Sequence, residues 1–382
     1  MPHRPNSDRR LLGGLAPGEF LARHWQRKPL LIRGAFARIP ALPDREALFA
    51  LAARDDVESR LITAFGGQWT MTQGPIERLP KQKRDWTLLV QGANLYDARA
   101  DALMRRFDFV SAIRLDDLMI SYAADGGGVG PHFDSYDVFL LQVEGARRWR
   151  WRGGNGVQRD LALVDGAPLK LLRHFAPTDE AVLEPGDMLY LPPHCAHEGT
   201  AIGPCTTASI GFRAPSWNEL AQEFLFALAE REWADDRYAD KARKPTGAPA
   251  AIDRAFVDAV GKRLAQIRWT RDDVQQFIGR YFSEPKAQVF FVSPPPLSQR
   301  QFVARARARG LALDLKTAML YRGHAGFICG DSFTIPGAAP ETFARLANRR
   351  ALDAASVIGL AGDDASLALL HMWWSNGWMR FA

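Results

Sequence analysis

The sequence has few cysteines and no long apolar run. Its three cysteines, among 382 residues, are scattered and odd in number, so they predict neither a disulfide framework nor a paired-cysteine zinc site. No apolar stretch approaches the roughly 18 residues of a membrane span, and no apolar signal-peptide segment follows the polar, basic first residues. These absences predict a protein of the reducing cytoplasm, with no membrane segment and no secretion.

Composition and charge leave the function open. A length of 382 residues predicts two or three domains, and the hydrophobic content of 47% is ordinary for packed globular protein. The net charge is +6 and the pI is about 9.3, but Lys and Arg are spread along the chain. The charge therefore fits a nucleic-acid-associated protein and an arginine-rich background about equally.

Residues 1–215 mix short helices with many short strands. The predicted strands share apolar or alternating patterns bounded by Gly, Pro and Asp turns: Val138–Val143, Arg147–Trp151, Asp187–Leu191 and Thr206–Phe212. A double-stranded β-helix of the cupin or jelly-roll type would bring such strands together around one interior site.

A helical segment is predicted over residues 216–292. Ser216 to Glu219 form a capping box, and two further amphipathic helices follow, around Phe256 and around Phe277. Three helices alone cannot cover one another's apolar faces, so this segment needs a partner surface. That surface is either the β domain of the same chain or the same helices of a second copy, which would make a homodimer.

The last segment, residues 293–382, follows a stiff Ser-Pro-Pro-Pro linker. We predict a helix from Ser298 to Arg309, a strand from Leu311 to Arg322, a hairpin at 323–336 and a helix from Pro340, together a small winged-helix-like domain. Four arginines of the first helix could contact nucleic acid, but no base-reading motif accompanies them, so we favour a solvated face: Arg300, Arg305, Arg307 and Arg309.

Three residues suggest a metal site. His132 and Asp134 are two residues apart on an extended segment, so their side chains point to the same side. His197 closes a strand-like run later in the chain. We prefer it to His194, which follows two prolines in the turn and is interpreted as a surface or supporting histidine. Two histidines and a carboxylate are the ligand set of non-haem Fe(II) oxygenases.

Two features flank this set. The glycine-rich segment 126–130 lacks the Lys-Ser/Thr of a phosphate loop, and we interpret it as a flexible lip that admits a protein side chain. If 2-oxoglutarate is the co-substrate, its distal carboxylate needs a buried cation, and the strand that follows the ligands carries Arg147, Arg148 and Arg150. Alternation lets one arginine of each neighbouring pair face inward, and an exposed salt-bridged face is the alternative.

Four motifs in order give the chain a family resemblance. They are the segments 20–34, 130–137 and 145–149, and the run from Pro185 to Gly199. Together they resemble the Jumonji-C-type, cupin-fold 2-oxoglutarate oxygenases, and more narrowly the bacterial ribosomal oxygenases that hydroxylate an arginine of a large-subunit ribosomal protein. The resemblance implies an α+β fold with an oxygenase domain at 1–215, a helical dimerisation domain at 216–292 and a winged helix at 293–382.

Site roles follow from the resemblance residue by residue. It implies that His132, Asp134 and His197 bind Fe(II), that Arg147 binds 2-oxoglutarate, and that O₂ is consumed as succinate and CO₂ form. Ser121 and Ser209 are expected to flank the co-substrate, with ordinary strand hydroxyls as the alternative.

Substrate contacts and competing functions stay open at this point. An arginine substrate would need an anionic contact near the mouth of the site. We expect Asp125 first and Asp137 second, although either could cap a turn. The alternatives are the same chemistry on another protein residue, including N-methyl demethylation, and a winged-helix nucleic-acid-binding regulator with a metal-sensing cupin.

Overall fold

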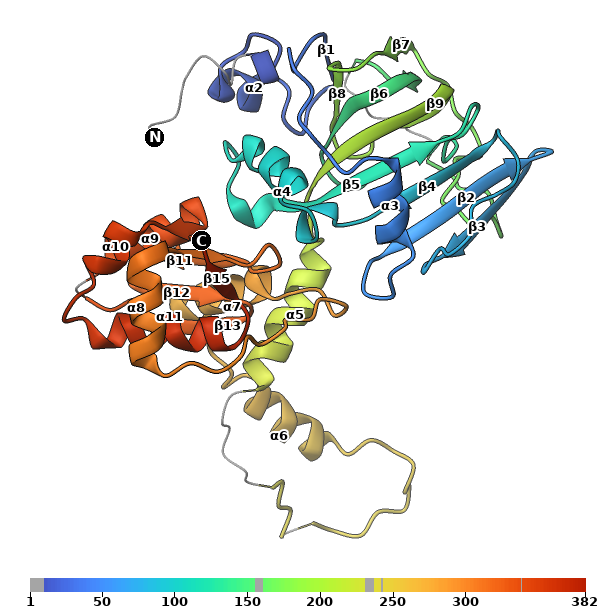
Figure 1. Ribbon diagram of the computed structural model, residues 1–382. Coiled ribbons are helices and arrows are strands. Elements are labelled where there is room, and N and C mark those ends of the chain that lie inside the picture. Colours follow the sequence, from blue (N-terminus) through green and yellow to red (C-terminus); the bar gives the residue numbers. More distant parts are fainter. Residues whose placement is uncertain (1–9, 155–160, 231–236, 242, 338) are drawn as a thin grey trace.

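The computed structural model describes residues 10–154, 161–230, 237–241, 243–337 and 339–382 (Figure 1). Its α-helices are α2 (Pro17–Arg23), α3 (Arg45–Ala52), α4 (Ala98–Met104), α5 (Trp217–Ala229), α6 (Arg254–Leu264), α7 (Arg271–Ser283), α8 (Gln299–Arg309), α9 (Pro340–Arg349), α10 (Ala354–Ile358) and α11 (Asp364–Ser375). Short 3₁₀ turns lie at Ala93–Leu95, Arg105–Phe107 and Ala112–Arg114.

One antiparallel sheet dominates the first half of the chain (Figure 1). Its strands are β1 (Leu30–Ile32), β2 (Ser59–Phe65), β3 (Gln68–Gln73), β4 (Trp86–Val90), β5 (Leu115–Ala123), β6 (Val138–Trp151), β7 (Asp179–Leu183), β8 (Met188–Leu191) and β9 (His197–Phe212). They pair in the order β1-β8-β6-β9-β5-β4-β2-β3, and β7 also pairs with β6.

Strand β6 corrects one prediction. The segments 138–143 and 147–151, predicted as two strands, form one strand that pairs with β9 over its whole length. Bulges lie between Gln142 and Ala146, and Gly145 there has a φ of +64° that favours glycine. A bulge adds a residue to one strand, so the chain can pass a turn signal without leaving the sheet.

The two faces of this sheet are buried differently. Phe139 and Leu141 of β6 belong to the largest apolar core, which also contains side chains of α2, α3 and α4. Leu140 points to the opposite face and packs with Trp149 and Leu189 in a smaller cluster. Period-two alternation along the strand therefore divides its residues between a core covered by helices and the face that carries the candidate site.

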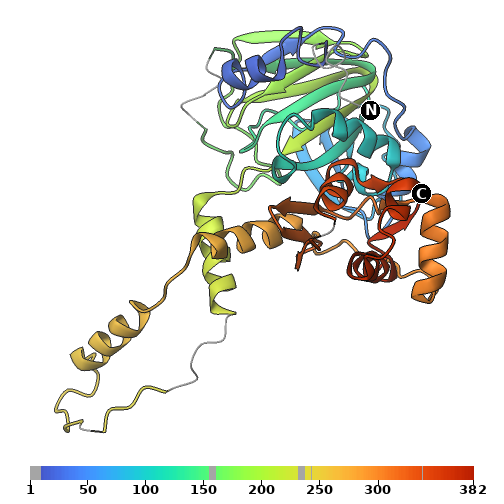
Figure 2. The same cartoon turned by 90° about the vertical axis from the view of Figure 1, so that its left-hand side faces the viewer.

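The first part of the helical segment, α5 and α6, extends from the rest of the molecule. α5 begins after the capping box of Ser216 and Glu219, as predicted, and contacts α7 through the rings of Phe224 and Phe277, whose centroids are 5.4 Å apart. α6 projects away from the other elements in both views (Figures 1 and 2). Within the described residues, no helix combines the length and apolar character needed to cross a membrane.

The C-terminal module has two small sheets and a core of its own. β10 (Leu311–Leu313) pairs with β14 (Ala351–Leu352) and β15 (Met379–Phe381), and β11 (Met319–Arg322), β12 (Ala325–Ile328) and β13 (Asp331–Thr334) form the second sheet. Trp373 and Trp374 are buried in that core. The predicted strand 311–322 is wrong as one element, because Asp314 accepts hydrogen bonds from Lys316 and Thr317 and turns the chain.

Candidate active site

His132 and His197 are brought together by the backbone. Each donates its backbone N–H to the carbonyl of the other, with N···O distances of 2.9 and 2.8 Å, and their ring centroids lie 4.2 Å apart. Asp134 completes the group, since its Oδ2 lies 3.7 Å from His197 Nε2. One side-chain donor atom from each of the three residues lies within 4.8 Å of the others. The three residues singled out in the sequence therefore form one cluster.

Backbone carbonyls fix the orientation of both rings. His132 Nδ1 lies 2.9 Å from the carbonyl oxygen of Gly130, and His197 Nδ1 lies 2.8 Å from that of Cys195. A carbonyl only accepts, so each Nδ1 carries the proton and donates it. Each Nε2 is then left with a lone pair, which is the tautomer that a metal ligand needs.

The environment also keeps His197 neutral. The ring is almost completely buried, and burial, followed by the proximity of His132, lowers its pKa to about 4. His194 differs, because it is exposed, has a φ of +61° and lies outside the cluster. Its backbone N–H donates to the carbonyl of Asp134 at 2.7 Å. The cluster therefore contains His197 and not His194, and its binding of a metal stays a prediction.

Arg147 is buried on the same side of the sheet as His197. Its guanidinium carbon lies 5.6 Å from the centre of the Trp149 ring, and that ring lies 5.9 Å from the His197 ring. Arg147 Nη1 donates to Ser121 Oγ at 3.3 Å, but its Nε and Nη2 are buried and have no hydrogen-bond partner in the described part of the chain. The indole nitrogen of Trp149 is buried and unpaired in the same way. Unpaired buried donors are rare, and together these N–H groups fit a carboxylate.

The neighbouring arginines point outward. Arg148 lies 3.4 Å from Glu180 in an exposed ion pair, and Arg150 pairs with Glu198. Arg147 is thus the inward member of this strand. Ser209 is buried on the same face as Ser121, opposite Leu140 of β6, so both serines line the region in which they were predicted. Their contact with a co-substrate stays a prediction.

The glycine segment is not the flexible lip that the sequence suggested. A Cβ at Gly127 would lie 2.2 Å from the carbonyl oxygen of Trp86, and one at Gly128 would lie 2.5 Å from that of Gly199. The segment also exchanges backbone hydrogen bonds with Ala201 of β9. These glycines therefore let the segment pack against the sheet next to His132, in place of a mobile cover.

The two predicted substrate contacts have different outcomes. Asp125 is partly exposed, but its carboxylate already accepts from Gly203 N at 2.9 Å and lies 3.4 Å from Arg84, so its role stays a prediction. Asp137 is fully buried, and Tyr190 donates its hydroxyl to it at 2.5 Å. The expectation for Asp137 is wrong, because its carboxyl belongs to the opposite, apolar face of the sheet and no substrate can reach it.

Sequence reasoning missed an acidic pair and a tyrosine. Asp117 is buried, and burial, followed by the charge of Asp116, raises its pKa to about 6. Burial, followed by the charge of Asp134, raises the pKa of Tyr136. A Cβ at Gly211 would lie 3.2 Å from Asp117 Oδ1 and 3.8 Å from the Tyr136 ring. Two adjacent acids at the start of an apolar strand were the available signal.

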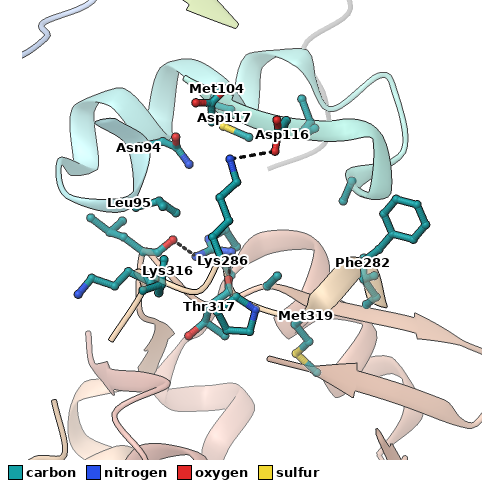
Figure 3. A pocket seen from close by; sticks show the side chains of 18 of the residues that line it. Asn94, Leu95, Met104, Asp116, Asp117, Phe282, Lys286, Lys316, Thr317 and Met319 are labelled. Carbon is teal, nitrogen blue, oxygen red and sulfur yellow. Dashed lines mark hydrogen bonds and ion pairs between the residues drawn. The ribbon is translucent and has the colours of Figure 1, made fainter. Parts of the chain in front are cut away.

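Asp116 is neutralised from outside the oxygenase sheet. Lys286 Nζ and Arg213 Nε each lie 3.3 Å from its Oδ1. Figure 3 shows Lys286 reaching up from the segment after α7 toward Asp116, across a small cavity lined by both modules. Asp117 Oδ2 accepts from Gly92 N and from Gln91, and no described residue donates to its Oδ1. Cations therefore compensate the charge of Asp116, whereas Asp117 keeps one carboxylate oxygen that can accept a further hydrogen bond.

Comparison with known proteins identifies both modules. Residues 102–220 match the JmjC domain family, and residues 266–380 match the ROXA-like winged helix. The chain is 34% identical over 301 residues to the Escherichia coli ribosomal protein uL16 3-hydroxylase, covering 77% of this chain and 79% of the relative. It is 36% identical over 213 residues to a probable ribosomal oxygenase of Haemophilus influenzae, covering 54% and 52%.

Solved structures agree with these relatives. The X-ray structure of E. coli YcfD superposes with a TM-score of 0.83 at 30% identity, covering 96% of this chain and 98% of that one. A second structure, of the E. coli ribosomal oxygenase YcfD with cobalt and 2-oxoglutarate, gives a TM-score of 0.81 with the same coverage. The predicted cupin-type oxygenase fold followed by a winged helix is confirmed, and the chain belongs to the JmjC ribosomal oxygenase family.

Proposed function

We propose that this protein is an Fe(II)- and 2-oxoglutarate-dependent oxygenase that hydroxylates an arginine side chain of a large-subunit ribosomal protein. The observation that carries the proposal is the pairing of two features on one sheet face. A cluster of two imidazoles and a carboxylate lies beside a buried arginine with unpaired N–H groups. A ribosomal substrate would also place the activity in the cytoplasm.

The donor set fits iron. His132 and His197 offer neutral Nε2 atoms, and Asp134 offers one carboxylate oxygen. Three ligands on one side of a six-coordinate ion leave three adjacent positions open. When bound there, Fe(II) would supply the oxidative chemistry that uses O₂ and 2-oxoglutarate to hydroxylate a carbon. The protein holds the two imidazoles in the metal-binding tautomer before the ion arrives.

Arg147 is proposed to bind the distal carboxylate of 2-oxoglutarate. Its unpaired Nε and Nη2 form one edge of the guanidinium, the geometry that binds a carboxylate through two parallel hydrogen bonds. Trp149 fills the space between Arg147 and His197 and excludes water from that side. Ser121 orients the guanidinium through its Nη1. Such burial strengthens each electrostatic contact, because few water molecules compete.

The surroundings of Asp117 favour a substrate side chain with positive charge. Asp117 keeps one acceptor oxygen, and this oxygen and the Tyr136 ring both lie within 4 Å of the position that a Cβ on Gly211 would take. Asp117 is nearly buried and borders the small cavity that Lys286 crosses. We propose that the guanidinium of the substrate arginine pairs with this carboxylate. The E. coli relative, which acts on ribosomal protein uL16 by its name, supports the same class of substrate.

Mass spectrometry tests the proposal. Purified protein with Fe(II), 2-oxoglutarate and a uL16 peptide is expected to add one oxygen atom to an arginine and to form succinate. His132→Ala should abolish both products, whereas His194→Ala, a matched change at an exposed histidine, should retain them. Loss of a methyl group from the peptide, or oxygen on another residue, would replace the arginine assignment with one of the alternative activities.

We also propose that the chain is a homodimer through its helical domain, within the division 1–215, 216–292 and 293–382. α5 and α6 leave large apolar side chains in solvent, including Phe226 at 68% and Leu264 at 60% exposure. Such faces usually mark an interface. Sedimentation should give a dimer that Phe226→Asp together with Leu264→Asp converts to monomer. A wild-type monomer at micromolar concentration would contradict this proposal.

A further inference from the structure

A large cleft lies between the oxygenase domain and the C-terminal module. Its volume is about 1040 Å³, and four separate segments of the chain form most of its walls. They are the segment 101–115 before β5, helix α7, and the segments 319–322 and 347–350 around β11 and the end of α9. The cleft exists only where these parts meet, and the candidate active site uses none of its residues.

Cations outnumber acids in this cleft. Its charged lining residues are Asp101 and Asp108 against five arginines: Arg105, Arg271, Arg322, Arg349 and Arg350. Two of the arginines are already bound. Arg105 pairs with Asp101 at 3.0 Å, and Arg350 donates to the carbonyls of Thr317 and Asp314.

Three arginines remain for a ligand. Arg271, Arg322 and Arg349 are exposed, and none of them forms an ion pair with another described residue. Arg271 begins α7, Arg322 ends β11 and Arg349 ends α9, so the three come from different elements. Guanidinium groups spread along a groove match the repeating negative charge of a phosphodiester chain.

The cleft also offers an aromatic surface. Tyr321 is 41% exposed, and its hydroxyl accepts a hydrogen bond from Asn348 Nδ2 at 3.0 Å, which holds the ring in place. Apolar side chains line the same space: Val110, Ile113, Val274 and Ile278. An exposed ring beside arginines and apolar side chains suits an unpaired base, whereas the bases of a duplex are stacked on one another and out of reach.

The helices of the C-terminal module do not gather arginines around one space. α11, which contacts β15, contains no Lys or Arg. On α8, Arg305 and Arg309 project to one side, whereas Arg300 and Arg307 project to the other, at 100° per residue. The cleft, in contrast, collects its free arginines around one space.

We propose that this cleft binds single-stranded nucleic acid. Arg271, Arg322 and Arg349 contact successive phosphates, and a base stacks on Tyr321. The interaction is separate from the oxygenase reaction and needs neither metal nor co-substrate. An acidic peptide is the competing ligand, but the exposed ring beside the arginines favours a nucleic acid.

Fluorescence anisotropy with the full chain and a labelled single-stranded oligoribonucleotide tests the proposal. Each arginine-to-alanine change should weaken binding about fourfold at physiological salt and lower the slope of log affinity against log salt by about 0.7, and the triple variant should lose roughly 50-fold. Tyr321→Leu should weaken binding at least about fivefold. Arg305→Ala, a matched change on α8, should have no effect. A single-stranded DNA arm separates a preference for RNA from binding of any single strand.

Three outcomes would overturn the proposal. The first is affinity that is equal in the wild type and the triple variant. The second is a loss in Arg305→Ala as large as that in Arg322→Ala, because binding would then follow net charge. The third is tighter binding of an oligoglutamate peptide than of the oligonucleotide, which would make the cleft a protein-binding surface. Melting temperatures of the variants, expected to match the wild type, exclude unfolding as the cause of a loss.

Discussion

The two faces of the main sheet bury different kinds of side chain. On one face Phe139 and Leu141 of β6 pack under helices in a continuous apolar core. On the other face the same strand places Arg147 and Trp149, with N–H groups that no described residue accepts. The first face gains stability from burial, whereas the second keeps donors that no described residue satisfies and that a bound ligand could pair. A single strand therefore serves stability and function through alternate residues.

The largest expected effect is on the polar face. Replacing Asp134 by Ala removes one of three donors and should abolish peptide hydroxylation, together with metal binding measured by calorimetry. The fold should persist, because Asp134 lies outside the apolar core. Hydroxylation that survives in Asp134→Ala would show that the reaction does not use this cluster.

A substitution on the apolar face should lower the stability of the fold. Phe139→Ala leaves a cavity in the core and should lower the free energy of unfolding by about 3–5 kcal/mol, measured by urea denaturation. Phe139 is fully buried among the rings of Phe20, Phe107 and Tyr190, which cannot easily collapse around the gap. A change below about 1 kcal/mol would mean that this face is not the main source of stability.

The substitution Arg147→Met tests most directly whether the two faces have different roles. Loss of the guanidinium should weaken 2-oxoglutarate binding about 10- to 100-fold. The unfolding free energy without co-substrate should stay constant or rise by up to about 1–3 kcal/mol, because two unpaired buried donors disappear. Arg148→Met, on the exposed side, is the control and should change neither quantity. Destabilisation by Arg147→Met would make the guanidinium a structural group.

A smaller effect is expected at the helices that cover the apolar face. Asp97 caps α4 by accepting from Arg99 N and Ala100 N, and Asp97→Ala should lower stability by about 1 kcal/mol. The hydrogen bond from Arg99 lowers the pKa of Asp97. The stabilisation is therefore present above the ordinary carboxylate pKa of about 4 and is lost as the pH falls through the lowered value. Urea denaturation of the wild type and of Asp97→Ala, from neutral to acidic pH, measures this loss. A difference in unfolding free energy that stays constant with pH would contradict the prediction.

Much of the site follows from local pattern. The spacing of His132 and Asp134 places both side chains on one side of the chain. The turn that follows Pro192 contains His194 and ends before His197, which begins β9. Alternation could also have excluded Asp137, because it has the same parity as Phe139 and Leu141 and so faces the apolar core. Asp117 was missed because its burial next to Gly211, a residue of the distant strand β9, arises only in the folded chain.

The sequence by itself determined the ligand types, the cap of α5 and the apolar strands, since each depends on neighbours within a few residues. The tertiary structure decided which arginine is buried. Leu140 and Gln142 of β6 face the site, and unbroken alternation would then bring Arg148 inward. The bulges between Gln142 and Ala146 change the parity, so Arg147 faces the site. A bulge is defined by pairing with β9, a partner that no local pattern specifies.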